Sequence, residues 1–430
     1  MIITEAVVFF TAVAQVYGAT IKKSSGLVAQ FSPSFPSLPE PTNVVTTYQA
    51  GPYATPKKLS RATLKGFPEP WEAPDTSSAE VQAVYKKLDF TKIPKAPVRK
   101  QNPDGTWVST SDGESDPFCW WSSTNCVKPK ASYLPPDIYT CPKKGDWGLT
   151  YDDGPYNLGK DDKVANKYAE PYLLNYLAEN NLHATLFYIG SNVATFPDAA
   201  RLGLKNGHQL CVHTWSHRVL TTLTDVEIVA ELYWTLKAIK AATGVTSKCF
   251  RPPQGDVDDR VRAIAYQMGM RTVLWDEDTQ DWNLLYNKEG SLSRKEANGY
   301  FETWIKNYKT GKDKSGHIVL EHELNPETVE LSISWLPKLK QTFNVVPALS
   351  CNGITHPYWE ESFEYPLFDS SDNGNSTAKN KTSATSSAAP SPTSSSAISS
   401  STSTKQSKSI TTASRTKSVA SSTSSIEKIA

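Results

Sequence analysis

Strand-like and helix-like segments alternate from Gly145 to about Ala348, and this alternation limits the folds that the chain can adopt. Short apolar runs have the composition of buried strands, and longer periodic segments between them have the spacing of helices. The strand-like runs are Trp147–Tyr151, Ala184–Ile189, Gln209–His213, Cys249–Arg251, Thr272–Trp275, His317–Glu321 and Asn344–Val346. The helix-like segments are Ala165–Asn180, Phe196–Asn206, Asp225–Ala242, Asp256–Met268, Ser293–Lys309 and Pro326–Thr342. This β/α repeat predicts an α/β fold, a distorted and mostly parallel (β/α) barrel with its site at the carboxyl ends of the strands.

Residues that favour helix ends support these boundaries. Thr224 and Glu227 have the spacing of a capping box, which predicts a helix that begins beside Asp225. Gly244 is suited to end that helix, and Pro326 is suited to the first turn of another.

Five short polar segments occur in the alternating region, and all but the first directly follow a strand-like run or come within a few residues of one. They are Thr150–Pro155, His213–His217, Arg251–Gly255, Asp278–Trp282 and Ile318–His322. Together they supply two adjacent carboxylates, two histidines four residues apart, an arginine and a third histidine. These groups can hold a divalent metal, activate a water molecule and protonate a leaving group.

The first two segments predict a metal site. Successive side chains of an extended segment point in opposite directions, so one of Asp152 and Asp153 can face a metal while the other faces an attacking water. His213 and His217 can chelate one ion if a helical turn begins there. An isolated pair with this spacing is more often one core and one surface histidine, but with Asp153 it forms a two-histidine, one-carboxylate set. We expect Zn²⁺ at this set, with Co²⁺ as an alternative.

The other three segments can complete a catalytic site. Arg251 precedes a loop stiffened by two prolines, and Gln254 is placed to present a backbone N–H there. His322 is a candidate general acid that Asp281 could orient and keep protonated. Two apolar side chains, Trp282 and Leu320, would form a small pocket beside it, while Glu321 and Glu323 would be solvated or would support their neighbours.

These five segments, in this order, resemble those of the polysaccharide deacetylase family, which is carbohydrate esterase family four with the NodB-like domain. The pattern is most similar to that of the fungal chitin deacetylases, and the resemblance covers about Lys144 to Val346. It implies a distorted (β/α) barrel. It also implies these roles: metal ligands Asp153, His213 and His217; general base Asp152, oriented by Arg251; general acid His322, supported by Asp281; a backbone oxyanion donor near Gln254; and an acetyl pocket of Leu320 and Trp282. The sequence departs from the family at Tyr151, where Phe is usual, and at Gln254, where Tyr is common.

The resemblance implies metal-assisted hydrolysis of the N-acetyl groups of chitin, or of chitin oligomers, to give chitosan and acetate. One alternative is O-deacetylation of acetyl xylan, because the family acts on both esters and amides. Another is a non-catalytic chitin-binding or cell-wall-binding protein, which predicts a missing base or ligand. A structural component of the wall is supported only by the Ser/Thr-rich tail.

Composition divides the chain into four parts. Residues 1–20 contain a short apolar run typical of a secretory signal peptide, although no basic residue precedes it. Residues 21–117 are expected to be an irregular N-terminal extension or pro-segment, and residues 118–355 the catalytic domain. Residues 370–430 form a Ser/Thr-rich tail with sequons at Asn375 and Asn380, so we expect it to be disordered and glycosylated. Its end shows no signal for a glycolipid anchor.

Secretion, to the extracellular space or the cell wall, fits these segments. No segment predicts a transmembrane span. The formal net charge of +1 gives no general attraction to nucleic acid.

The six cysteines fit an oxidising compartment. Cys141 and Cys351 lie beside the first and last strands, which are neighbours in a barrel, so they are the preferred pair. Cys211 and Cys249 each lie in a strand before a polar segment, and either a disulfide between them or two buried thiols fits the sequence. A Cys119–Cys126 bridge would then close a local loop.

Overall fold

We describe the protein from a computed structural model, in residues 28–102, 106–108, 115–156, 171–284 and 291–368. The expected signal peptide and the Ser/Thr-rich tail with its sequons lie outside these ranges. So does the first part of the helix expected over 165–180, of which Tyr172–Glu179 is helical. Within the described ranges, no helix has the length and apolar character needed to cross a bilayer.

A single parallel sheet forms the centre of the fold. Its strands have the order β5-β4-β3-β2-β1-β7-β6, and β8 pairs with β1 outside this path. Their bounds are β1 Asp146–Asp152, β2 Thr185–Tyr188, β3 Gln209–Val212, β4 Cys249–Phe250, β5 Arg271–Thr272, β6 Glu277–Asp278, β7 His317–Leu320 and β8 Asn344–Pro347. The side chains of β1, β2, β3 and β7 are buried throughout, as expected for strands covered on both faces.

Strand β1 is the central strand, and it has different neighbours along its length. Its first half pairs with β8 on one side and β7 on the other, with Trp147 opposite both Val345 and His317. Its second half pairs with β2, and Tyr151 lies opposite Leu186 there. The carboxyl end of β1 is therefore held between β2 and β7, in the middle of the sheet.

The two edges of the sheet are close together. Strands β5 and β6 lie at opposite ends of the strand order, yet only residues 273–276 connect them. Since an extended residue spans at most about 3.6 Å, this connection keeps the edges within roughly 20 Å of each other. Of the strand predicted over 272–275, only Thr272 lies in β5; the rest belongs to this connection, and β6 begins beyond it at Glu277. The curled, all-parallel arrangement confirms the expected distorted barrel.

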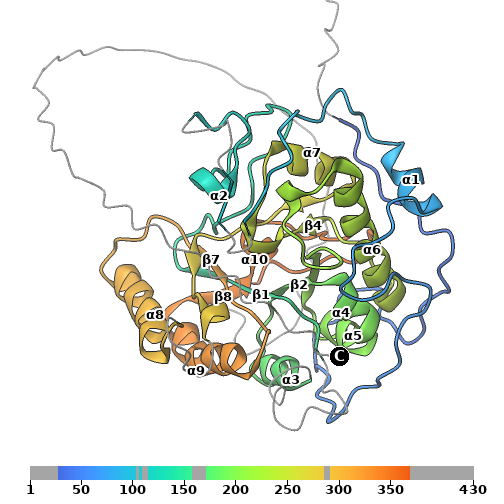
Figure 1. The fold of residues 1–430 in the computed structure, drawn as a ribbon. Coiled ribbons are helices and arrows are strands. Elements are labelled where there is room, and N and C mark those ends of the chain that lie inside the picture. The colour runs from blue at the N-terminus through green and yellow to red at the C-terminus, as the bar shows by residue number, and fades with distance from the viewer. Residues whose placement is uncertain (1–27, 103–105, 109–114, 157–170, 285–290, 369–430) are drawn as a thin grey trace, which may run out of the picture.

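Helices surround the sheet (Figure 1). Their bounds are α1 Ala79–Tyr85, α2 Trp121–Thr124, α3 Tyr172–Glu179, α4 Gly190–Thr195, α5 Pro197–Lys205, α6 Asp225–Thr243, α7 Asp259–Gln267, α8 Arg294–Lys309, α9 Pro326–Thr342 and α10 Ala348–Cys351. The predicted ends of α6 are confirmed: Thr224 and Glu227 form a capping box, and Gly244 adopts the left-handed conformation beyond the last turn. Pro326 occupies the first turn of α9. The short helix α4 was not predicted.

The described part of the N-terminal extension is irregular apart from α1 and packs along the barrel. In Figure 1 it is the blue segment that passes α1 and α6. The Lys237 ammonium of α6 pairs with Glu80 of α1 at 2.6 Å. Further along, Asn206 exchanges two hydrogen bonds of 2.9 Å with the backbone of Ala54, and Arg99 forms a buried ion pair with Asp258.

The preferred Cys141–Cys351 disulfide is present, and so are the two bridges that the sequence left open, Cys119–Cys126 and Cys211–Cys249. The Cys141–Cys351 bridge joins the segment that leads into β1 to the helix that follows β8, which confirms the argument from neighbouring first and last strands. The Cys211–Cys249 bridge joins β3 to β4, so these residues are not free thiols.

Candidate active site

The five polar segments meet at the carboxyl end of the sheet. Asp152 ends β1 and Asp153 follows it, whereas His213 comes directly after β3 and Arg251 directly after β4. His322 lies just beyond β7, in a parallel bridge with Asp152. The parallel sheet thus brings together segments that are up to 170 residues apart in sequence, as its topology predicts.

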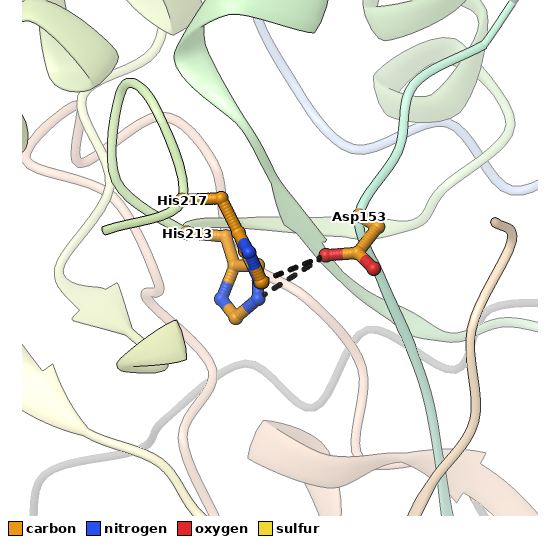
Figure 2. A group of neighbouring side chains, drawn as sticks. All are labelled: Asp153, His213 and His217. Atoms are coloured by element: carbon orange, nitrogen blue, oxygen red, sulfur yellow. Dashed lines mark ion pairs between the residues drawn. The ribbon is translucent and has the colours of Figure 1, made fainter. Parts of the chain in front are cut away.

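Asp153, His213 and His217 form a compact group with the geometry of a metal site (Figure 2). Asp153 Oδ1 lies 3.5 Å from Nε2 of His213 and 3.3 Å from Nε2 of His217. Ligands at about 2.1 Å from a tetrahedral ion are themselves roughly 3.3 Å apart, so these spacings leave room for one. Asp153 Oδ1 is buried and accepts no hydrogen bond from the described residues. One carboxylate and two imidazoles, with an orphaned oxygen between them, fit a divalent metal such as zinc.

Hydrogen bonds to neighbouring backbone and side-chain groups orient these ligand residues. His213 Nδ1 lies 2.8 Å from the backbone carbonyl of Arg251, which can only accept a hydrogen bond, so Nδ1 carries the proton and the Nε2 lone pair faces Asp153. Asn192 donates to the Asp153 carbonyl at 2.7 Å. Asp153 itself adopts a left-handed backbone conformation with φ 74°, which turns its side chain away from the direction of β1.

The protonation states of the group also suit metal binding. Burial lowers the pKa of His217 to about 4, so its imidazole is neutral near pH 7. Burial alone would raise the pKa of Asp153, but the neighbouring His217 and His213 outweigh that effect and hold it well below the usual range. Asp153 is therefore an ionised carboxylate and His217 a neutral imidazole, the forms that ligate metals.

Asp152 lies beside this group but is held by Arg251. The fully buried guanidinium donates from Nη1 to Asp152 Oδ1 at 2.6 Å and to Thr150 Oγ1 at 2.9 Å. Its Nη2 donates to the Leu274 carbonyl at 3.1 Å, and its Cζ lies 4.0 Å from the centre of the Phe187 ring. This fixes one oxygen of Asp152, while Oδ2 lies 3.7 Å from His213 Nε2, on the side of the metal group.

His322 and Asp281 form a second buried pair. The Asp281 carboxylate accepts from the His322 backbone N–H at 2.8 Å through one oxygen and lies 2.6 Å from His322 Nδ1 through the other. Burial would lower the pKa of His322, but the charge and hydrogen bond of Asp281 raise it to about 10. His322 is therefore an imidazolium that has a proton to give at neutral pH.

The residues expected to contact substrate lie on neighbouring segments. Gln254 is exposed and adopts a left-handed conformation with φ 56°. Trp282 is partly exposed in a short turn beside Asp281, whereas Leu320 is buried at the end of β7. At Gly255, a β-carbon would lie 2.4 Å from the Trp121 ring, so this loop can follow its course only with glycine there.

Two flanking carboxylates are not solvated, although solvation was one of the two expectations for them. Glu321 and Glu323 are both buried behind the site, and burial raises the pKa of Glu321 to about 8. A β-carbon at Gly154 would overlap the Glu323 side chain, which explains the glycine after the two aspartates. The Tyr151 hydroxyl lies 2.7 Å from Ser332 Oγ, so this departure from the usual Phe has a buried partner.

Three supporting roles were not predicted from the sequence. Thr150 begins the first polar segment, but its hydrogen bond with Arg251 was not expected, and no local pattern marks Asn192. Glu231 could have been noticed, because it is a charged residue in a helix whose residues are buried on nearly every side.

Fold and site together define a class of protein: a parallel β/α barrel that carries a two-histidine, one-aspartate group beside a second aspartate and a third histidine. Residues 139–273 match the family model described as polysaccharide deacetylase.

The chain is 38% identical over 339 residues to the chitin deacetylase of Amylomyces rouxii, with 76% of each protein covered. It is 37% identical over 334 residues to chitin deacetylase 2 of Cryptococcus neoformans var. grubii, covering 76% of this chain and 70% of that protein. It is 33% identical over 280 residues to chitin deacetylase 2 of Saccharomyces cerevisiae, covering 64% and 78%. The chain belongs to the polysaccharide deacetylase family.

Proposed function

We propose that this protein hydrolyses the N-acetyl groups of chitin, releasing acetate and leaving a free amine on the sugar. The observation that carries the proposal is the placement of Asp152, held by Arg251, and of His322, held by Asp281, beside the Asp153 metal group. The relatives named chitin deacetylases support chitin as the substrate.

A divalent ion, with zinc as our first choice and cobalt as an alternative, would be held by Asp153, His213 and His217. Bound there, it would supply Lewis acidity toward the acetamide oxygen and lower the pKa of water. The proton transfers and the contacts with substrate are assigned to the residues around it.

Asp152 is the proposed general base. Arg251 occupies its Oδ1, so Oδ2 is the atom available to take a proton from the attacking water. Because Arg251 is buried and bound at several atoms, the direction of the carboxylate is fixed before substrate arrives.

His322 is the proposed general acid. Asp281 holds its Nδ1, so Nε2 is the atom that gives a proton to the sugar nitrogen when the amide bond breaks. An amine leaves poorly as an anion, and a positioned imidazolium removes that barrier. The loop at Gln254 would give a backbone N–H to the oxyanion, and Leu320 with Trp282 would enclose the acetyl methyl.

The domain organisation and location follow from the same proposal. Residues 118–355 would be the catalytic domain, residues 1–20 a signal peptide, and residues 370–430 a glycosylated tail. Three disulfides and the fungal relatives fit a protein that works outside the cell or in its wall.

The test is mass spectrometry of chitin tetramer after incubation with the chelator-treated protein, with and without Zn²⁺ or Co²⁺. We expect loss of acetyl groups only when metal is added. Acetylated xylan in parallel tubes tests the ester alternative, and release of acetate from xylan alone would replace chitin as the proposed substrate. Asp152→Asn is the control for contaminating activity, and activity equal to wild type in that variant would contradict the proposal.

A further inference from the structure

The loop that carries both histidines, residues 213–217 (the histidine loop), has an unfavourable backbone. Thr214 and His217 adopt left-handed conformations with φ 66° and 56°. For residues other than glycine this conformation is unfavourable, and it persists only where the surroundings impose it. The contacts that hold the histidine loop are therefore part of what makes the metal group possible.

One carboxylate of α6, that of Glu231, holds the histidine loop through hydrogen bonds. Glu231 is fully buried, and its Oε2 accepts from the backbone N–H groups of Trp215 and Ser216 at 2.8 and 2.9 Å. Its Oε1 accepts from the Ser216 hydroxyl at 2.6 Å. These donors are two of the three residues between the histidines, so Glu231 fixes the turn through the backbone of the loop and not through the metal group.

Residues 67–71 of the N-terminal extension (the strap) also contact the histidine loop and the residues that hold it. The Phe67 ring stacks on the Trp215 indole with centroids 6.1 Å apart and planes at 7°. Trp215 Nε1 donates to the Glu69 carbonyl at 3.3 Å. Trp71 N donates to Ser191 Oγ at 2.8 Å, and Ser191 Oγ in turn donates to the Trp215 carbonyl at 2.6 Å.

Trp71 also has a strained backbone, which shows that the strap docks in one specific form. Its φ is 68°, and its side chain is 44% exposed, so little packing of the indole accounts for that conformation. Its backbone N–H is the group that the barrel binds. The strap and Glu231 thus both hold Trp215: the strap contacts its ring and Nε1, and its carbonyl through Ser191, while Glu231 accepts from its backbone N–H.

We propose that the strap and Glu231 are positioning elements for the metal group: they hold the histidine loop in the form that lets His213 and His217 bind one ion. This inference rests on the metal site proposed above. It assigns the N-terminal extension a permanent part in the working enzyme, in place of the alternative that it is a pro-segment to be removed.

The test compares Zn²⁺ affinity, by competition with a chromophoric chelator, in full-length variants. Trp71→Pro removes the N–H and cannot adopt the left-handed conformation, whereas Trp71→Gly keeps both and loses only the indole. Glu231→Ala leaves the backbone N–H groups of Trp215 and Ser216 without an acceptor. Glu231→Gln keeps one acceptor oxygen for them. We expect Trp71→Pro and Glu231→Ala to weaken binding about 10–100-fold, and their partners to stay within roughly threefold of wild type.

Asn206→Ala controls for general loosening of the extension, since it breaks the contact with Ala54 beside α5. Visible absorption of the Co²⁺ forms reports ligand geometry, which a merely destabilising change would leave as in wild type. Affinities and Co²⁺ spectra of Trp71→Pro and Glu231→Ala that match those of Asn206→Ala would overturn the inference. A wild-type protein that binds no stoichiometric metal would instead overturn the proposed site.

Discussion

Asp152 and His322 face each other as bridged residues where β1 and β7 end. Asp152 N donates to the Glu321 carbonyl at 2.9 Å, and Glu323 N donates to the Asp152 carbonyl at 3.1 Å. The proposed base and acid are thus joined through one ladder of backbone hydrogen bonds. Their side chains have different partners, because Arg251 pairs with Asp152 and Asp281 pairs with His322. Amide hydrolysis needs a base and an acid at one site, and these separate partners allow the two residues to take different roles.

We expect the two adjacent aspartates to differ in function. Asp152→Asn should keep stoichiometric zinc and lose about 10²–10⁴-fold in turnover, because the base is removed and the ligands remain. Asp153→Asn should lose metal affinity together with activity. Elemental analysis and deacetylation of chitin tetramer on both variants would check this. Metal loss in Asp152→Asn, with metal retained in Asp153→Asn, would reverse the assignment.

The histidine pair is expected to be necessary for metal binding. A His213→Ala/His217→Ala variant removes two of the three ligands, so it should retain no stoichiometric zinc at micromolar concentrations. His183→Ala is the matched control, since His183 is a buried histidine outside the metal group that contacts Tyr53 at 2.7 Å. Full metal content in the double variant would show that the ion binds elsewhere.

Asp281 should set the pH range of activity through His322. The carboxylate raises the pKa of that histidine, and the acid works only while it is protonated. Asp281→Asn should therefore shift the alkaline limb of the kcat profile to lower pH, in addition to lowering the maximum rate. His322→Ala should remove the limb and reduce the rate about 10²–10⁴-fold while metal stays bound. An unmoved limb in Asp281→Asn would mean that another group supplies the proton.

The parts of this site that the sequence could predict are those fixed by local order. A carboxylate or histidine directly after a strand must lie at the carboxyl edge of a parallel sheet, so Asp153, His213 and His322 could be grouped from the sequence alone. The end of β5 at Thr272 and the new strand at Glu277 could not be predicted, because sheet curvature decides where the pairing changes. The burial of Glu321 and the contact of Glu231 with Trp215 also depend on long-range packing. Neighbouring residues mark Glu231 as a charge in a mostly buried helix, but they do not indicate its partner.

The Cys141–Cys351 disulfide should stabilise the barrel strongly. It closes a loop with a sequence separation of 210 residues, and cross-links that close long loops restrict the unfolded chain most. Cys141→Ala/Cys351→Ala should lower the free energy of unfolding by about 2–5 kcal/mol, measured by denaturant titration. The same pair of substitutions at Cys119 and Cys126, with a separation of 7, should cost less. Equal losses in the two variants would argue against the loop-length explanation.

His317 should make stability depend on pH at the end of β7 opposite to His322. Its Nδ1 lies 2.8 Å from Asp276 and its Nε2 lies 3.3 Å from Asp313, with Glu277 at 3.8 Å. Burial would lower the pKa of His317, but Asp276, Asp313 and Glu277 raise it to about 9. The folded state therefore holds the proton more tightly than the unfolded chain, in which histidine has a pKa near ~6.5.

The stabilisation by protonated His317 is consequently complete below about pH 6.5 and is lost as the pH rises through about 9. His317→Gln should lower the free energy of unfolding by about 1–2 kcal/mol more at pH 6 than at pH 10, a range that allows for solvent screening of the partly exposed carboxylates. Denaturant titrations of both proteins at the two pH values, on chelator-treated samples, would measure the difference. His356→Gln is the control, because the hydrogen bond between His356 and the neighbouring Thr355 hydroxyl involves no carboxylate. A gap between wild type and His317→Gln that is the same at pH 6 and pH 10 would show that His317 acts by packing and not by charge.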